Sequence, residues 1–111
     1  MIRDETEALA QITQRIVERF HPQRVVLFGS RSRKQARPSS DYDILIIAPS
    51  QEKRWRRTAP VYSELAQLNM PCDIDVVWWT PEEIAEWKDV RAHFVTTALR
   101  EGRTLYGDVT R

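Results

Sequence analysis

The sequence predicts an α/β (α+β) fold in which a small mixed sheet of three or four strands is flanked by helices. Three short apolar runs rich in β-branched residues, over residues 24–28, 42–48 and 73–79, indicate buried strands. Around them, apolar residues recur every three or four positions, which indicates amphipathic helices. Interleaved strands and helices assemble as layers around one core, and 111 residues leave room for a single domain over 1–111.

The first predicted helix precedes the first strand. Its apolar residues fall three or four positions apart: Leu9, Ile12, Ile16 and Phe20. Asp4 and Glu7 have the spacing of a capping box, and Pro22 ends the helix. After the first strand and Gly29, the polar and basic residues 30–40 predict a turn and then a loop.

Helices are also predicted after the second and third strands. Residues 50–68 favour a helix that restarts near Pro60, because proline does not fit a helix interior. The apolar positions of this helix are Trp55, Tyr62, Leu65 and Leu68. Thr80, Pro81 and Glu83 form a strong start signal for a short helix to about Lys88. A last helix is expected over about 89–100, with Gly102 as its C-terminal cap.

Composition narrows the class of function. Seventeen basic against 16 acidic residues give a net charge of +1, which excludes a bulk electrostatic binder of nucleic acid or membrane but leaves room for a local basic patch. The apolar runs are too short to span a bilayer, and the polar N-terminus does not resemble a signal peptide. Cys72 is the single cysteine and lies far from His21 and His93 in sequence, so no disulfide or zinc site is predicted. We expect a cytoplasmic protein with no membrane partner.

The candidate chemistry begins with two aspartates. Asp41 and Asp43 are two residues apart at the start of the second strand, so their side chains are expected on one face. Two carboxylates aimed the same way repel each other unless a cation lies between them. Carboxylate oxygens suit Mg²⁺ or Mn²⁺, and the pair could hold two ions. On the third strand Asp73 and Asp75 share a face, and Asp75 could complete the cluster if the strands are neighbours.

A second candidate element is the turn after the first strand. Gly29 and Ser30 follow a buried strand, where backbone N–H groups and a hydroxyl can bind an anion. The residues behind them add positive charge: Arg31, Arg33, Lys34 and Arg37. The turn suits a phosphate group and the aspartates suit a divalent metal, so the two together predict a ligand that carries both. Each element alone is often only a turn or a solvated strand end, but their order and spacing favour a functional site.

These residues resemble a known signature. Gly29-Ser30, a gap of ten residues, Asp41-Tyr42-Asp43 and the later Asp75 look like the motif of the DNA polymerase β-type nucleotidyltransferase superfamily. More narrowly, the chain resembles the minimal nucleotidyltransferases (MNT) of HEPN/MNT toxin–antitoxin pairs. DIDVVWWTPEEI and REGRTLYG resemble the family's third strand with its following helix and its C-terminal tail, so the likeness covers nearly the whole chain.

The resemblance implies a reaction and a set of site residues. It implies transfer of AMP from ATP, the substrate, to a hydroxyl, with two Mg²⁺ ions as cofactors and Mn²⁺ as the alternative metal. The residues implied for binding the triphosphate are Gly29 and Ser30, with Arg31 beside them. The catalytic and metal-binding residues implied are Asp41, Asp43 and Asp75. Asp75 could also accept the proton of the acceptor hydroxyl.

The resemblance also implies a partner. In the family the small transferase is the antitoxin of a helical HEPN toxin, an RNase, and can modify a toxin tyrosine with AMP. We therefore expect an oligomer with such a toxin, and no direct nucleic-acid partner. The core leaves no sequence for an acceptor-binding domain, so the acceptor belongs to another chain or is small.

Several alternatives remain open at this stage. A non-catalytic antitoxin would act by contact alone, and four tryptophans could form its interface or simply pack on the sheet: Trp55, Trp78, Trp79 and Trp87. A subunit of an aminoglycoside-type nucleotidyltransferase would act on a small molecule. Arg15 and His21 have the spacing of an RNase toxin motif, but that motif belongs to an all-helical fold. DNA polymerisation would need a region that grips the duplex.

Overall fold

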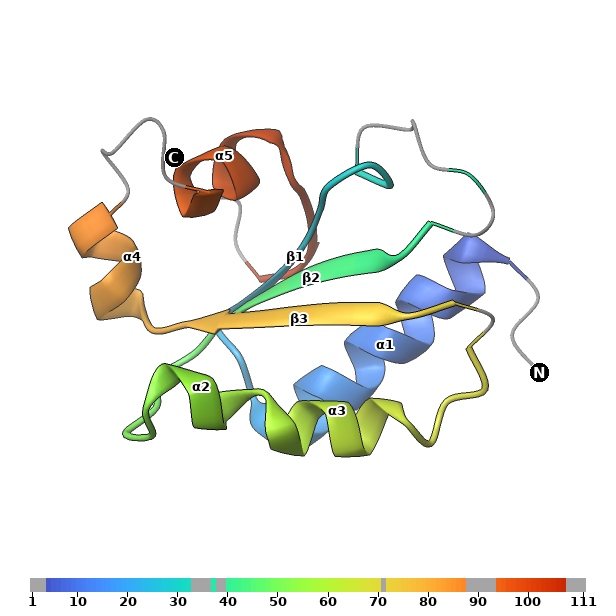
Figure 1. Cartoon of the computed structure of the whole chain (residues 1–111), viewed down its shortest axis with the longest axis horizontal. Helices are drawn as coiled ribbons and strands as arrows, with labels where there is room; N and C mark the ends of the chain where they lie inside the picture. Colours follow the sequence, from blue (N-terminus) through green and yellow to red (C-terminus); the bar gives the residue numbers. More distant parts are fainter. Residues whose placement is uncertain (1–3, 33–36, 38–39, 71, 88–93, 108–111) are drawn as a thin grey trace.

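Four strands form one mixed sheet in the order β3-β2-β1-β4 (Figure 1). The strands are β1 (Arg24–Phe28), β2 (Tyr42–Ile47), β3 (Ile74–Trp79) and β4 (Arg103–Tyr106). β1 is antiparallel to β2 and β4, whereas β2 and β3 are parallel. This computed structural model describes residues 4–32, 37, 40–70, 72–87 and 94–107. The expected fold class is confirmed, in its four-stranded form.

Five helices lie among the described residues: α1 (Glu5–Phe20), α2 (Arg54–Arg57), α3 (Ala59–Leu65), α4 (Pro81–Trp87) and α5 (Phe94–Glu101). α1 begins as expected, with the Glu7 N–H donating to the Asp4 carboxylate at 2.9 Å. The α4 capping box is confirmed as well: the Thr80 N–H donates to Glu83 Oε1, and the Glu83 N–H donates to Thr80 Oγ1.

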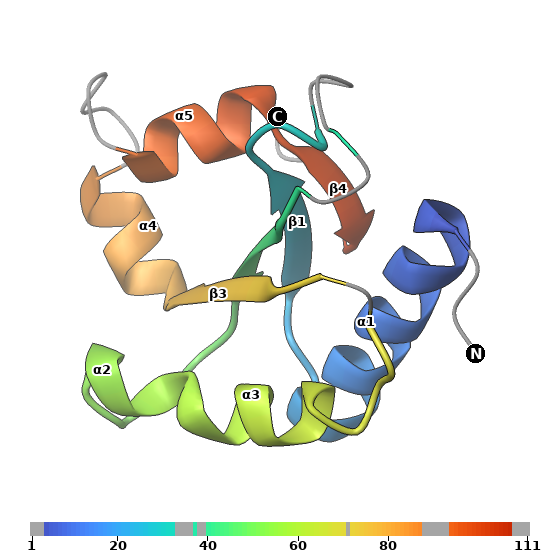
Figure 2. The same ribbon diagram turned by 45° about the vertical axis from the view of Figure 1, so that its right-hand side comes forward.

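Two helical layers enclose the sheet, as Figures 1 and 2 show. One layer contains α1, α2 and α3, and the other contains α4 and α5. Because strand side chains alternate between faces, the core divides into two clusters. The first cluster joins β-strand residues such as Ile44 and Ile46 to Ile12 of α1 and Val61 of α3. The second joins Leu45, Ile47 and Trp79 to Ala98 of α5.

The restart expected near Pro60 in the region after β2 is confirmed, with two short helices in place of one long one. α2 ends at Arg57 and α3 begins at Ala59, so Pro60 occupies the first turn of a new helix, where its missing N–H costs nothing. Trp55 was expected at an apolar position, but its side chain is 70% exposed. The other tryptophans belong to the core: Trp78 and Trp79, both in β3, are buried in the first and second clusters, and Trp87 is half-buried against the second.

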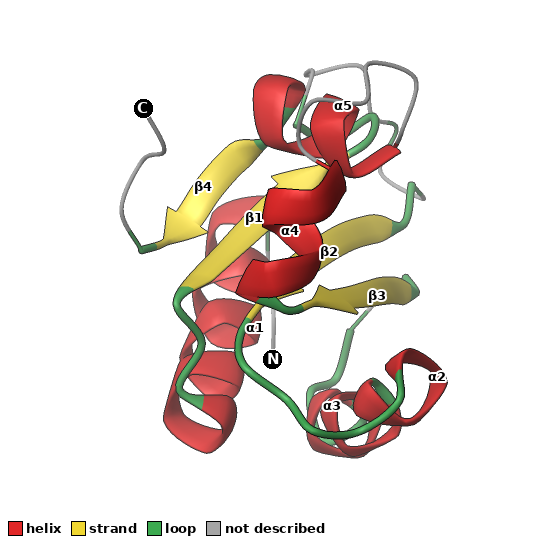
Figure 3. Ribbon diagram, turned by 90° about the vertical axis from the view of Figure 1, so that its left-hand side faces the viewer, coloured by secondary structure: helices red, strands yellow, loops and turns green. Residues whose placement is uncertain are grey.

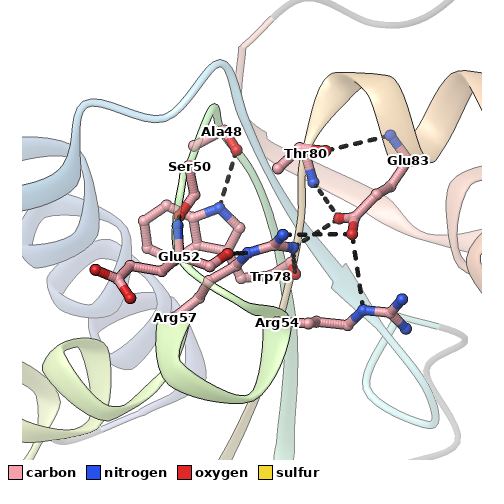
Figure 4. A network of polar contacts seen from close by, with 8 residues as sticks. All are labelled: Ala48, Ser50, Glu52, Arg54, Arg57, Trp78, Thr80 and Glu83. Atoms are coloured by element: carbon pink, nitrogen blue, oxygen red, sulfur yellow. Dashed lines mark hydrogen bonds and ion pairs between the residues drawn. The ribbon is translucent and has the colours of Figure 1, made fainter.

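An ion-pair network fixes α2 against the start of α4 (Figure 4). Arg57 is only 9% exposed, and its guanidinium donates to both carboxylate oxygens of Glu83, at 2.6 and 3.3 Å. It also donates to the carbonyls of Glu52 and Trp78. A buried charge requires this degree of pairing. The network holds the carboxyl-terminal end of β3, and Figure 3 shows α2 and α4 on either side of that strand.

Several predictions lie outside the described residues, among them Arg33, Lys34, Pro38, His93 and the first part of the helix expected over 89–100. Within the described part of the chain, no helix is both long and apolar enough to cross a membrane.

Candidate active site

Asp43 and Asp75 face each other across two neighbouring strands. β2 and β3 pair in parallel with Asp43 opposite Asp75, so the two side chains emerge on the same face of the sheet. That face continues into the second core cluster through Leu45 and Val77. Asp75 is exposed and Asp43 half-buried, so the carboxylates stand where the covered part of the face ends. The two strands are neighbours, which is the condition under which Asp75 could join the carboxylate cluster.

Asp41 and Asp73 each lie one residue before a strand. Asp41 is exposed, and its charge still acts on Asp43. The Asp73 carbonyl accepts a hydrogen bond from the Tyr42 N–H at 3.0 Å, which ties the two segments together before the parallel pairing begins. The register sets Asp75, not Asp73, opposite Asp43. Of the two candidates for a third carboxylate, Asp75 therefore has the better position.

The electrostatics of this group are unfavourable for three ionised carboxylates. Burial raises the pKa of Asp43, and the negative charges of Asp75 and Asp41 raise it further. A divalent cation would reverse this repulsion, and hard carboxylate oxygens are the ligands that Mg²⁺ and Mn²⁺ prefer. The donor chemistry therefore fits such ions. Among the described side chains, no three of His, Cys, Asp or Glu are grouped as a ready-made metal site.

Gly29 lies directly beside Asp43. Phe28, the last residue of β1, is the antiparallel partner of Asp43, and the chain turns at Gly29 with φ of +74°. A β-carbon built at Gly29 would overlap Asp43 Oδ2 and approach Asp43 Cγ to 3.1 Å. Only glycine fits this close approach without strain. Ser30 follows in the turn, which is closed by the Ser32 N–H and hydroxyl donating to the Gly29 carbonyl.

Arg31 is buried, with 7% of its surface exposed, and makes many contacts within the protein. Its guanidinium donates to the Ser40 carbonyl from Nε at 3.0 Å and from Nη2 at 2.7 Å, and it pairs with Glu5 at 3.0 Å. It also stacks 3.9 Å from the centre of the Tyr42 ring. Arg31 thus joins the turn after β1 to the segment on either side of Asp41. No sequence signal marked these contacts, because Glu5, Ser40 and Tyr42 are distant from Arg31 in sequence.

The turn after β1 and the amino-terminal ends of β2 and β3 therefore meet at one end of the sheet, on the right of Figure 1. A small backbone turn with a hydroxyl side chain stands next to acidic side chains from two strands. This arrangement suits a phosphate-bearing ligand accompanied by a divalent ion.

Comparison with known proteins identifies the family. The family described as "Polymerase beta, Nucleotidyltransferase" matches residues 10–109. The chain belongs to this nucleotidyltransferase family. No curated protein matches the chain.

Solved structures share the nucleotidyltransferase fold. A chain from a toxin–antitoxin crystal structure with AMP-PNP is 21% identical, with a TM-score of 0.57 over 90% of this chain and 73% of that one. A chain of the MntA–HepT toxin–antitoxin is 19% identical, with a TM-score of 0.53 over 94% and 74%. The tri-AMPylated Shewanella oneidensis HEPN toxin in complex with its MNT antitoxin provides a match at 20% identity and a TM-score of 0.52, over 93% and 72%.

Proposed function

We propose that this nucleotidyltransferase moves AMP from ATP to a hydroxyl of a partner protein, in a reaction that depends on Mg²⁺, with Mn²⁺ as an alternative. The observation that carries the proposal is the placement of Asp43 opposite Asp75, directly against the Gly29 turn. Like charges drawn together in this way destabilise the free protein, and a cationic ligand relieves that cost.

Asp41, Asp43 and Asp75 are the proposed metal-binding and catalytic residues. When bound, divalent ions would neutralise the triphosphate and lower the pKa of the acceptor hydroxyl. Asp75 is exposed and so can also accept the proton of that hydroxyl. The pKa of Asp43, half-buried between Asp75 and Gly29, is raised by burial and by the neighbouring carboxylates, and a cation beside it would favour its ionised form.

Gly29 and Ser30 are proposed to hold the triphosphate. With no side chain at Gly29, the backbone can come close to a phosphate group, and the Ser30 hydroxyl can donate to it. We assign Arg31 a positioning role, since its guanidinium already donates to Ser40 and Glu5 and stacks on the Tyr42 ring. It would hold the triphosphate turn and the segment of Asp41 at a fixed separation.

The partner proposed is a HEPN-family toxin, and the acceptor a tyrosine of that toxin. Support comes from solved structures with the same fold. One is a toxin–antitoxin complex with AMP-PNP, and one is a complex of an AMPylated HEPN toxin with an MNT antitoxin. In this proposal the chain is a cytoplasmic antitoxin that forms an oligomer with the toxin and inactivates it by adenylylation.

Label transfer tests the proposal. A HEPN-family toxin is mixed with this chain, Mg²⁺ and ATP labelled on the α-phosphate, and the modified residue is mapped by mass spectrometry. We expect one or more AMP groups on a tyrosine with the wild type and none with Asp43→Asn. A toxin that is inhibited equally by both proteins, with no label, would instead establish an antitoxin that acts by contact alone.

A further inference from the structure

The outer edge of β3 carries a surface that the proposed active site does not use. A groove of about 500 Å³ runs along this edge, and its lining residues are Arg54, Trp55, Thr58, Val76, Val77 and Trp78. Trp55 stands at its border with 70% of its surface exposed, the most exposed large apolar side chain described. Exposed tryptophan beside an apolar groove is typical of a protein–protein contact.

Positive charge lies on one side of the groove, at α2 and the residue before it. Four of the five residues 53–57 are Lys or Arg, in a chain whose net charge is only +1. Lys53 and Arg56 are exposed, whereas Arg54 and Arg57 both pair with Glu83, at 3.8 and 2.6 Å. The Arg56 guanidinium lies 4.8 Å from the centre of the Trp55 ring. An occupant of this surface therefore needs negative charge around an apolar side chain.

Side chains of α2 and α3 occupy part of the outer backbone edge of β3. The Val76 N–H donates to the Tyr62 hydroxyl at 2.8 Å, and the Trp78 carbonyl accepts from Arg57 at 3.3 Å. Two of the backbone groups that would pair with another strand are thus already bonded within the chain. These bonds favour insertion of a partner's side chain into the groove over addition of its backbone as a fifth strand.

The position of the groove connects it to the active site. Val76, Val77 and Trp78 follow Asp75 on the same strand. At about 3.3 Å per residue, the groove begins beside Asp75 and reaches about 10 Å from it. A protein seated here would bring its neighbouring surface to the carboxylates.

We propose that the acceptor protein docks on the Trp55 groove through an acidic surface that inserts an apolar side chain between Trp55 and Trp78. This inference rests on the proposed function, because it names the surface that presents the hydroxyl to Asp75. Apolar walls from Val76 and Val77 favour a protein side chain over a nucleotide base.

Binding without chemistry tests the docking directly. The Asp43→Asn form of the full chain is titrated by calorimetry, without nucleotide, with the HEPN-family toxin used in the label-transfer test. Trp55→Ala in this background is expected to weaken binding at least about tenfold, as for a central tryptophan of an interface. Tyr106→Ala is the matched control, since Tyr106 is 42% exposed on the opposite edge strand β4, and it should bind as tightly as its parent.

Charge reversal tests the chemistry of the partner. Lys53→Glu with Arg56→Glu should abolish most binding and the dependence of the affinity on salt. Arg19→Glu with Arg100→Glu makes the same change of charge at exposed sites on α1 and α5, and should have little effect. Weakening by both pairs alike would overturn the docking site.

The outcomes separate the two proposals. Loss of binding on Trp55→Ala, with no AMP transfer by the wild type, would support the groove and contradict the enzymatic proposal. Normal binding and transfer by Trp55→Ala and by the charge-reversed form would overturn the groove alone. Tight, Trp55-dependent binding of a single-stranded RNA oligomer, with none of the protein, would also overturn it.

Discussion

The two ends of the parallel pair β2–β3 each gather charged side chains, but in opposite ways. At the carboxyl-terminal end, Arg57 is buried against Glu83, and both partners are hydrogen-bonded. At the amino-terminal end, Asp43 and Asp75 are set side by side with Asp41 nearby. The first arrangement pairs opposite charges within the chain, whereas the second places like charges together, and in the proposed function a divalent cation relieves their repulsion. On that proposal, the contrast distinguishes an anchor of the fold from a binding site.

The pKa values follow the same contrast. Burial acts to raise the pKa of Glu83, but hydrogen bonds from Arg57 and the Thr80 N–H, with the charges of Arg57 and Arg54, bring it below its ordinary value. For Asp43, burial and neighbouring carboxylates all act to raise the pKa. Ionisation therefore stabilises the fold at Glu83 and destabilises it at Asp43.

The largest expected effect is on catalysis at the acidic end. Asp43→Asn removes a proposed metal ligand whose contribution to the transition state is several kcal/mol, so AMP transfer should fall at least about 1,000-fold. Without divalent ions the same variant should be more stable than the wild type at neutral pH, since the repulsion is gone. Label transfer and urea unfolding measure the two effects, and a variant that is inactive because it is unfolded would contradict this account.

At the other end, Arg57→Ala should destabilise the fold. It removes one partner of a buried ion pair and leaves the Glu52 and Trp78 carbonyls without this donor, so we expect a loss of about 3 kcal/mol in the free energy of unfolding. Arg15→Ala is the control, since Arg15 pairs with Glu64 at the surface, and it should cost at most about 1 kcal/mol. Equal losses of free energy of unfolding in the two variants would contradict the role of Arg57 as an anchor of the fold.

Gly29→Ala tests the close approach between the turn and Asp43. Alanine at φ of +74° is strained by about 1–2 kcal/mol, and its β-carbon would displace the Asp43 carboxylate. We expect a modest loss of stability together with weaker Mg-ATP binding, measured by calorimetry. Unchanged Mg-ATP affinity would place the triphosphate elsewhere.

The pH dependence of stability should separate the ends. Glu83→Gln should be less stable than the wild type at neutral pH, and the difference should shrink as the pH falls through the lowered pKa of Glu83. Asp43→Asn should exceed the wild type in free energy of unfolding only at higher pH. This difference should grow as the pH rises from the ordinary aspartate pKa through the raised pKa of Asp43. Urea titrations at several pH values measure both, and parallel curves for the two variants would contradict the contrast.

Local sequence signals predicted much of this structure. The capping boxes at Asp4 and Thr80, the restart near Pro60 and the limits of β1 depend on residues a few positions apart, so they could be recognised in the sequence. Alternation likewise predicted one face for Asp41 and Asp43 and one face for Asp73 and Asp75, whereas the pairing of Asp43 with Asp75 depends on the register between two strands. Their roles as metal ligands, and those of Gly29 and Ser30 with the triphosphate, stay predictions.

Features set by distant partners could not be predicted in the same way. The burial of Arg31 depends on Glu5 and Ser40, and that of Arg57 on Glu83, so neither has a local signature. Trp55 has apolar spacing, yet the short α2 leaves it facing solvent. β4 has only four residues and gains its stability from pairing with β1, a distant segment. The sequence therefore predicted three strands and left the fourth open.

The central claim is that Asp43 and Asp75, from neighbouring strands, bind divalent cations together. Calorimetric titration with Mn²⁺ tests it in the wild type, Asp75→Asn and Asp73→Asn, the last a matched control one residue before β3. The account predicts that Asp75→Asn weakens Mn²⁺ binding at least about tenfold, as expected for loss of one ligand, while Asp73→Asn binds like the wild type. Equal affinities in all three proteins, or a greater loss at Asp73, would contradict it.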